Sequence, residues 1–125
     1  MISETNILYI DDEPDIRLIV EMALQLREGV RVRTAGSGKE AFQILDKENW
    51  RPDLILVDVM MPEMDGPAVL ARLRANTETD KVPVGFITAK ARQQDIDAYL
   101  TLGAAGVITK PFDPMSLADQ VLALI

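Results

Sequence analysis

Five short apolar runs, separated by amphipathic stretches, limit the architectures open to this chain of 125 residues. The runs have the length of strands and are mostly rich in Val and Ile: 7–10, 30–34, 54–57, 84–87 and 106–109. Such alternation is typical of a parallel sheet covered by helices on both faces, because parallel strands need a crossover of helix length. We therefore predict an α/β fold. In the second run Arg31 and Arg33 alternate with Val30 and Val32, which predicts an edge strand with one side in solvent.

Apolar residues at helical spacing predict five helices, one after each run. Proline suits the first position of a helix, and glycine suits the position after its last residue, as we expect for Gly29. Aspartate suits the N-cap of a helix, as we expect for Asp113. The expected helices lie at 14–29, around 41–45, at 67–73, at 96–103 and at 113–125. We expect Asp65 and Gly66 in a turn. The result is one domain over residues 1–125 without a repeat or linker, so an output domain would lie outside this sequence.

The composition narrows the chemistry open to this domain. With 20 acidic and 13 basic residues the net charge is −7, so its field repels a phosphate backbone and we expect no direct contact with nucleic acid. The chain has no cysteine and no histidine, which excludes disulfides, phosphohistidine, His-ligated zinc and Ser-His-Asp triads. The apolar runs are too short for a membrane span or a signal peptide. We therefore expect a soluble, cytoplasmic protein without membrane association.

Four of the five runs end in a residue that can take part in phosphate or metal chemistry. These residues are Asp11 and Asp12 after the first run, Asp58 after the third, Thr88 after the fourth and Lys110 after the fifth. The carboxyl ends of parallel strands share one edge of the sheet, and ligands bind there at the point where the winding reverses. In the strand order 2-1-3-4-5 this point lies between the first and third strands. We therefore expect Asp11 and Asp12 beside Asp58.

Three carboxylates in one pocket repel each other and need either protons or a cation. Mg²⁺ suits such a pocket, because it binds one or two carboxylates and keeps waters that substrate oxygens can replace. Thr88 offers a hydroxyl, and Lys110 a positive charge, for the oxygens of a transferring phosphoryl group. Asp58 is then the acceptor, since a carboxylate can attack phosphorus to form an aspartyl phosphate.

Each of these residues also has a purely structural interpretation when it is taken alone. Asp11 and Asp12 suit the cap of the following helix, Thr88 suits a cap or a strand, and a loop lysine such as Lys110 is commonly solvated. Asp58 is harder to explain in this way, because it directly follows four apolar residues and a buried charge is costly unless it is paired. The predicted site therefore depends on the joint placement of these residues at four strand ends.

This pattern resembles the receiver domains of two-component response regulators over essentially the whole chain. The matching segments are Ile10-Asp11-Asp12, Asp58-Val59-Met60-Met61-Pro62 followed by Asp65-Gly66, Thr88-Ala89, and Lys110-Pro111-Phe112. The resemblance implies a flavodoxin-like fold and a phosphoryl group transferred to Asp58 from a sensor histidine kinase or a phosphotransfer protein. It also implies four Mg²⁺ ligands, direct or through water: Asp11, Asp12, Asp58 and the main-chain carbonyl of Met60.

The same resemblance implies roles for residues near the fifth strand. Thr88 and Lys110 would bind the phosphoryl oxygens, and the peptide bond between Lys110 and Pro111 would be cis, which a bond before proline tolerates. A downstream effector protein, or an output domain outside this sequence, would recognise the change of surface that follows phosphorylation.

The chain departs from this family at a switch position. Many receivers carry an aromatic residue in the fifth strand, where this sequence has Val107, so we expect the change to pass through the loop at 88–90. Gly85 weakens the packing of the fourth strand unless another backbone approaches closely. Met60 and Lys90 follow the acceptor and the hydroxyl residue by two positions, and neither can take a proton from an attacking water. We expect both to modulate a slow self-dephosphorylation.

Three other classes of protein share parts of this pattern. A haloacid-dehalogenase-like phosphatase also uses a strand-end aspartate and Mg²⁺, but Met60 stands where its acid–base aspartate is expected. A flavodoxin-like cofactor binder needs a hydroxyl- or glycine-rich phosphate loop, and this chain has Asp11-Asp12-Glu13 there. A degenerate receiver that only binds proteins has no need of all five site residues. The sequence leaves open whether the receiver stands alone or belongs to a longer protein.

Overall fold

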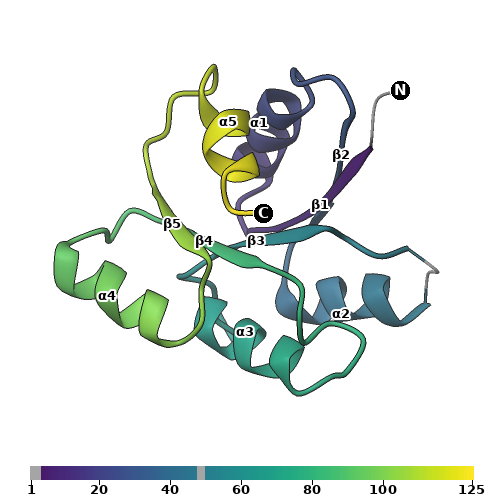
Figure 1. The fold of residues 1–125 in the computed structure, drawn as a ribbon, viewed down its shortest axis with the longest axis vertical. Helices are drawn as coiled ribbons and strands as arrows, with labels where there is room; N and C mark the ends of the chain where they lie inside the picture. Colours follow the sequence, from purple (N-terminus) through teal and green to yellow (C-terminus); the bar gives the residue numbers. More distant parts are fainter. Residues whose placement is uncertain (1–3, 48–49) are drawn as a thin grey trace.

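The five apolar runs form a parallel sheet at the centre of the protein in the computed structural model, which describes residues 4–47 and 50–125 (Figure 1). The strands are β1 (Thr5–Ile10), β2 (Val30–Ala35), β3 (Leu54–Asp58), β4 (Val84–Thr88) and β5 (Gly106–Thr109). Their order in the sheet is β2-β1-β3-β4-β5, as predicted. β3 and β4 are buried along their whole length, as near-continuous apolar strands covered on both faces must be. β2 lies at one edge and exposes Arg31, as its alternating sequence predicts.

Five helices cover the two faces of the sheet. They are α1 (Pro14–Leu24), α2 (Gly38–Lys47), α3 (Gly66–Arg74), α4 (Gln93–Thr101) and α5 (Leu117–Leu122). α1 and α5 lie on one face, and α2, α3 and α4 lie on the other (Figure 1). Each face has its own apolar core, one containing Tyr9 and Leu56 and the other containing Val57 and Phe86. Within residues 4–47 and 50–125, no helix has both the length and the apolar composition needed to cross a bilayer.

The first helix is shorter than the sequence indicates. α1 ends at Leu24, and the chain continues in turns in which the N–H of Arg27 donates to the carbonyl of Leu24 at 3.2 Å. Residues 25–28 are exposed, so no apolar face remains there whose burial would favour another helical turn over these local bonds. Gly29 does not end the helix. It has a φ of 86° and leads the chain into β2.

The fifth helix begins later than expected. α5 starts at Leu117, and its N-cap residue is Ser116 rather than Asp113. The Asp113 carboxylate accepts a bond from the N–H of Met115 at 3.0 Å, so it caps a separate turn before the helix. Ile125, the last residue of the expected helix, is 58% exposed because the helix ends before it.

The limits of the other helices agree with those that the sequence predicts, but one residue has a different role from the one that we expected. α4 is followed by Gly103, whose φ of 110° suits the residue after a helix. α3 starts at Gly66, immediately before Pro67. Asp65, which we expected only in a turn, is the N-cap residue of α3 and accepts a bond from the N–H of Ala68 at 2.9 Å.

Gly85 lies inside β4 because a side chain near the C-terminus occupies the space beside it. A Cβ at Gly85 would lie 2.6 Å from Cδ1 of Leu124 and 3.2 Å from Cδ1 of Leu56. Gly106, which pairs with Gly85 in the register of β4 and β5, faces the same Leu124 side chain. The space beside Gly85 is therefore filled by a side chain and not by another backbone. The two glycines together form a recess for Leu124.

Candidate functional site

The residues at the strand ends meet at the carboxyl edge of the sheet. Asp58 and Thr88 are the last residues of β3 and β4, while Asp11 and Lys110 directly follow β1 and β5. One carboxylate oxygen from each of Asp11, Asp12 and Asp58 lies within 4.8 Å of the other two. Asp11 is fully buried and Asp58 is 5% exposed, whereas Asp12 is exposed. The fold thus brings together the three acids that the sequence predicted to be neighbours.

Lys110 reaches from the end of β5 into this acidic cluster. Its Nζ donates to Oδ2 of Asp11 at 3.0 Å and to Oδ2 of Asp58 at 3.2 Å, and it lies 4.0 Å from a carboxylate oxygen of Glu13. Three clustered carboxylates and one ammonium leave two negative charges uncompensated, and oxygen ligands of this kind are those that a hard divalent cation prefers. The peptide bond between Lys110 and Pro111 is cis, which confirms that prediction.

Burial and charge together set the ionisation of Asp58 and Lys110. Burial raises the pKa of the Asp58 carboxyl and the neighbouring Asp11 raises it further, and these outweigh the lowering by the Met60 N–H and by Lys110. Burial lowers the pKa of the Lys110 ammonium, but its bonds to Asp11 and Asp58 outweigh burial and leave the pKa above its usual value. Lys110 is therefore protonated at neutral pH. The ionised form of Asp58 is less stable in the folded protein than in the unfolded chain.

Asp11 is held by two residues that the sequence analysis did not assign to the site. The Tyr9 hydroxyl donates to Oδ2 of Asp11 at 2.5 Å, and the N–H of Glu13 donates to Oδ1 at 2.9 Å. Tyr9 is fully buried. The sequence did indicate that Tyr9 lies near the site, because Tyr9 in β1 and Asp11 just after it are two positions apart. Their side chains therefore point to the same side of the sheet.

Thr88 connects the acidic cluster with α4. It is 1% exposed, and its Oγ1 accepts a bond from the N–H of Lys90 at 3.0 Å. Burial raises the pKa of the Tyr99 phenol, Asp95 raises it further, and a hydrogen bond with the Thr88 side chain lowers it. The Tyr99 phenol of α4 therefore lies near the hydroxyl that we expected to bind phosphoryl oxygens.

The Tyr99 ring packs against the core on the α4 side of the sheet. It contacts Phe86 edge-to-face, with ring centroids 5.3 Å apart. Val107 is the register partner of Phe86, is half-buried, and packs against the same core as Tyr99. The aromatic side chain near Thr88 thus comes from α4 instead of β5.

A cavity of about 200 Å³ opens over the acidic cluster. It is lined by Glu13, Asp58, Met60, Thr88, Ala89 and Lys110. Met60 is 59% exposed, and its N–H donates to Oδ1 of Asp58 at 3.1 Å. Lys90 is exposed and does not line the cavity. Of the two residues that we expected to modulate the site, only Met60 stands at its opening.

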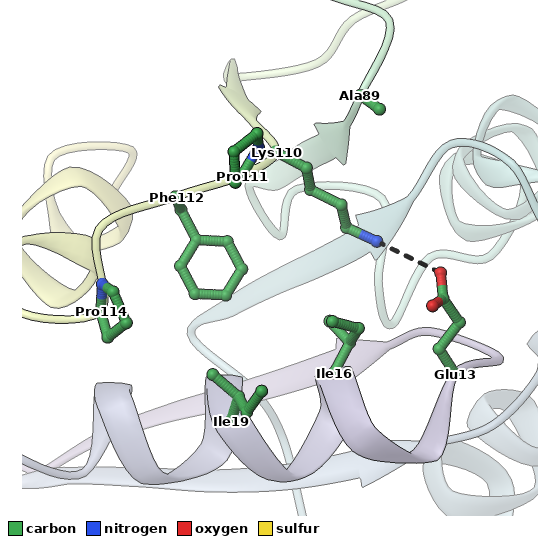
Figure 2. A pocket seen from close by; sticks show the side chains of 8 residues that line it. All are labelled: Glu13, Ile16, Ile19, Ala89, Lys110, Pro111, Phe112 and Pro114. Atoms are coloured by element: carbon green, nitrogen blue, oxygen red, sulfur yellow. Dashed lines mark ion pairs between the residues drawn. The ribbon is translucent and has the colours of Figure 1, made fainter.

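A second cavity, of about 440 Å³, lies beside the first between α1 and the segment after β5. Figure 2 shows the Phe112 ring above Ile16 and Ile19 of α1, with the Lys110 side chain directed toward Glu13. A further cavity of about 290 Å³ continues along α1 and is lined by apolar residues: Ile19, Met22, Ala23, Leu26 and Pro114. An apolar groove, defined by these two cavities, therefore leads along α1 to Lys110.

Comparison with known proteins relates the whole chain to a single family. Residues 7–122 match the family model of the response regulator receiver domain. An uncharacterised 14.6 kDa protein of Leptolyngbya boryana is 38% identical over 120 residues, which cover 96% of this chain and 89% of that protein. The probable transcriptional regulatory protein TcrX of Mycobacterium tuberculosis is 41% identical over 119 residues, which cover 95% of this chain and 47% of TcrX.

The structural comparison agrees with the sequence matches. The solved structure of the chemotaxis response regulator CheY4 of Vibrio cholerae superimposes with a TM-score of 0.88 at 29% identity, over 98% of this chain and 100% of that one. The shared feature is the five-stranded, doubly wound fold. The chain spans about half the length of the curated transcriptional regulators that it matches.

Replacing Asp58 by Asn should stabilise the protein when no metal is bound. The raised pKa of Asp58 means that folding disfavours the charged carboxylate, and asparagine removes the charge but keeps an oxygen for the Met60 N–H. In EDTA at neutral pH we expect the free energy of unfolding to rise by about 1 kcal/mol, measured by urea denaturation. Asp46→Asn, on the exposed side of α2, should change it by less than about 0.5 kcal/mol. A less stable Asp58→Asn would contradict the argument.

Proposed function

The chain belongs to the family of response regulator receiver domains, and from that premise we propose that it is a Mg²⁺-dependent phosphorylation switch with Asp58 as the phosphoryl acceptor. The family as such serves two-component phosphorelay signalling. The observation that supports the proposal most directly is the burial of Asp58 at the sheet edge between Asp11 and Lys110. An aspartate in this position is costly to the fold, so a chemical role explains it better than a structural one.

The proposed metal ligands are the three clustered carboxylates and one main-chain oxygen: Asp11, Asp12, Asp58 and the carbonyl of Met60. The donor set is all oxygen and carries an excess of negative charge beside Lys110, which fits Mg²⁺ better than a softer ion. Bound there, Mg²⁺ would supply positive charge that lets an anionic phosphoryl donor approach the acids.

In the proposed transfer, a carboxylate oxygen of Asp58 forms a bond to phosphorus while the bond from phosphorus to the donor histidine nitrogen breaks. That nitrogen keeps the electron pair and leaves with the partner protein. Lys110 turns from Asp58 to the phosphoryl oxygens, and the Thr88 hydroxyl donates to another of them. Both residues already line the cavity over Asp58, so neither needs to come from a distant position.

The apolar groove along α1 is suited to the protein that donates the phosphoryl group. It ends at Lys110, and it is bordered by side chains that are exposed although they are apolar, including Met22 at 62% and Leu26 at 67%. An apolar helix of a sensor histidine kinase or a phosphotransfer protein could bury these side chains while it presents a phosphohistidine to Asp58. The donor is therefore expected on the α1 side of the molecule.

Labelling by acetyl phosphate should require both Asp58 and a divalent metal. Without a cation the clustered acids repel the anionic donor, and without Asp58 no acceptor remains. We expect one added phosphoryl group by intact-protein mass spectrometry in Mg²⁺, and none with Asp58→Asn or with excess EDTA.

The same experiment separates a receiver from its competitors. Asp46→Asn should be labelled like the wild type, because Asp46 lies on α2 and outside the acidic cluster. Label that persists in Asp58→Asn or in EDTA would refute the assignment. Repeated release of phosphate without a stable adduct would favour a phosphatase instead.

We also propose that the output depends on Tyr99 rather than on Val107. When Thr88 donates to a phosphoryl oxygen, its hydrogen bond with Tyr99 changes, and Tyr99 belongs to a helix with no fully buried residue. α4 is thus weakly anchored and free to shift with the loop at 88–90. The surface formed by α4, β5 and α5 would change in this way. A downstream effector would recognise the changed surface, or an output domain would, since the longer relatives are long enough to contain one.

Conservative replacements at these two positions should have different effects. Tyr99→Phe keeps the ring on Phe86 but removes the hydroxyl that meets Thr88, so the phosphorylation-dependent NMR shifts of residues 93–109 should fall to about half or less. Val107→Ala should leave those shifts nearly intact. Equal shifts in Tyr99→Phe and the wild type, or their loss in Val107→Ala with the fold preserved, would place the coupling in β5.

The lifetime of the phosphoryl group is proposed to depend on Met60 and Lys90. Hydrolysis needs a water aligned opposite the Asp58 oxygen, and the Met60 thioether at the opening can cover that approach but cannot accept the proton of the water. Lys90, which is exposed, can reach phosphoryl oxygens but is no base when protonated. We therefore propose that self-dephosphorylation is slow.

An amide at the opening should accelerate that hydrolysis. Met60→Asn can orient a water, so we expect phosphate release to become about tenfold faster, measured after removal of the donor. Lys90→Glu should accelerate it less, because Lys90 does not line the cavity over Asp58. If neither substitution speeds release, these positions do not set the lifetime.

A further inference from the structure

The hydrogen bond between Tyr9 and Asp11 lies in the interior of the protein, because both side chains are fully buried. Tyr9 belongs to β1 and is fully buried, and its ring packs in the core beneath α1 and α5. Its hydroxyl donates to Oδ2 of Asp11 at 2.5 Å. A buried hydroxyl without a partner is costly, so this bond fixes both the ring and the carboxylate.

The two oxygens of Asp11 are used differently. Oδ1 accepts the N–H of Glu13 at 2.9 Å, whereas Oδ2 accepts both the Tyr9 hydroxyl and Nζ of Lys110. The same Nζ also donates to Asp58 at 3.2 Å. Tyr9 and Lys110 therefore donate to the same oxygen of Asp11, and Lys110 also donates to Asp58.

We propose that Tyr9 is a positioning residue of the metal site, acting through Asp11. Its hydroxyl sets the orientation of the Asp11 carboxylate and satisfies part of the hydrogen-bonding capacity of Oδ2. Asp11 then binds Lys110 less tightly, and Lys110 stays available to Asp58. This inference rests on the proposed function, since it takes Asp11 to be one of the residues that hold Mg²⁺.

Loss of the hydroxyl would change the competition for Asp11. Without the Tyr9 donor, Oδ2 has Lys110 as its remaining side-chain partner among the bonds found in residues 4–47 and 50–125. The carboxylate can then turn toward Lys110 and form a closer ion pair with it. A cation must displace that ion pair to bind, so the affinity for Mg²⁺ falls. A partner of a metal ligand typically contributes about tenfold or more to affinity.

The test compares Mg²⁺ binding to unphosphorylated wild type and Tyr9→Phe by isothermal titration calorimetry at fixed ionic strength. We expect about tenfold weaker binding by Tyr9→Phe. Thr79→Val is the matched control, because Thr79 also has a buried hydroxyl. This hydroxyl donates to the carbonyl of Leu73 in α3 at 2.7 Å and makes no bond to the three clustered acids. The control variant should bind Mg²⁺ like the wild type, even though it loses stability.

A second measurement avoids substitution altogether. The chain has two tyrosines, so labelling of tyrosine Cζ gives two NMR signals, and the Tyr9 signal should move as Mg²⁺ binds while the Tyr99 signal changes less. Equal affinity of Tyr9→Phe and wild type, or a Tyr9 signal that does not respond to bound Mg²⁺, overturns the role of Tyr9. Absence of Mg²⁺ binding by the wild type instead overturns the proposed metal site.

Discussion

The mutual repulsion of three carboxylates, only partly offset by one lysine, is the constraint on which the rest of this structure depends. Asp11, Asp12 and Asp58 are held within a few ångströms of one another by strands whose apolar residues are almost all buried. Lys110 enters from the far edge of the sheet and bonds to two of the acids. The apolar cores on both faces must stabilise the fold enough to hold this arrangement. The remaining negative charge gives the site the electrostatic character that the proposed Mg²⁺ and phosphoryl group require.

The sequence predicted the sheet and the cluster well, because both follow from patterns that repeat along the chain. Five apolar runs determine a parallel sheet, and residues at their ends must share an edge. The predicted end of α1 and the predicted start of α5 were wrong, since a few local hydrogen bonds determine these limits. Tyr9 was missed because a tyrosine in an apolar run is usually a core residue, and its spacing of two positions from Asp11 indicates a shared side of the sheet but not a hydrogen bond.

The ring that packs against Phe86 is carried by a helix and not by the neighbouring strand β5. Val107 gives β5 a small side chain, and Tyr99 of α4 supplies the ring that contacts Phe86. Residue patterns within one element could not predict this contact, because it joins a strand and a helix whose contact depends on the tertiary fold. The Thr88 hydroxyl consequently meets a side chain carried by a helix that has no fully buried residue.

The separation of the site residues along the chain also affects how the protein folds. Asp11 and Lys110 are 99 positions apart and come together only when β5 has joined the sheet. A partly assembled sheet without β5 lacks the ammonium that offsets the acids, so the repulsion between the carboxylates is stronger there than in the native state. Ion pairs that form only at the completed edge leave the folding rate nearly unchanged and act mainly by slowing unfolding. The two ion pairs of Lys110 then lengthen the life of the native state, and with it the resistance of the chain to proteolysis.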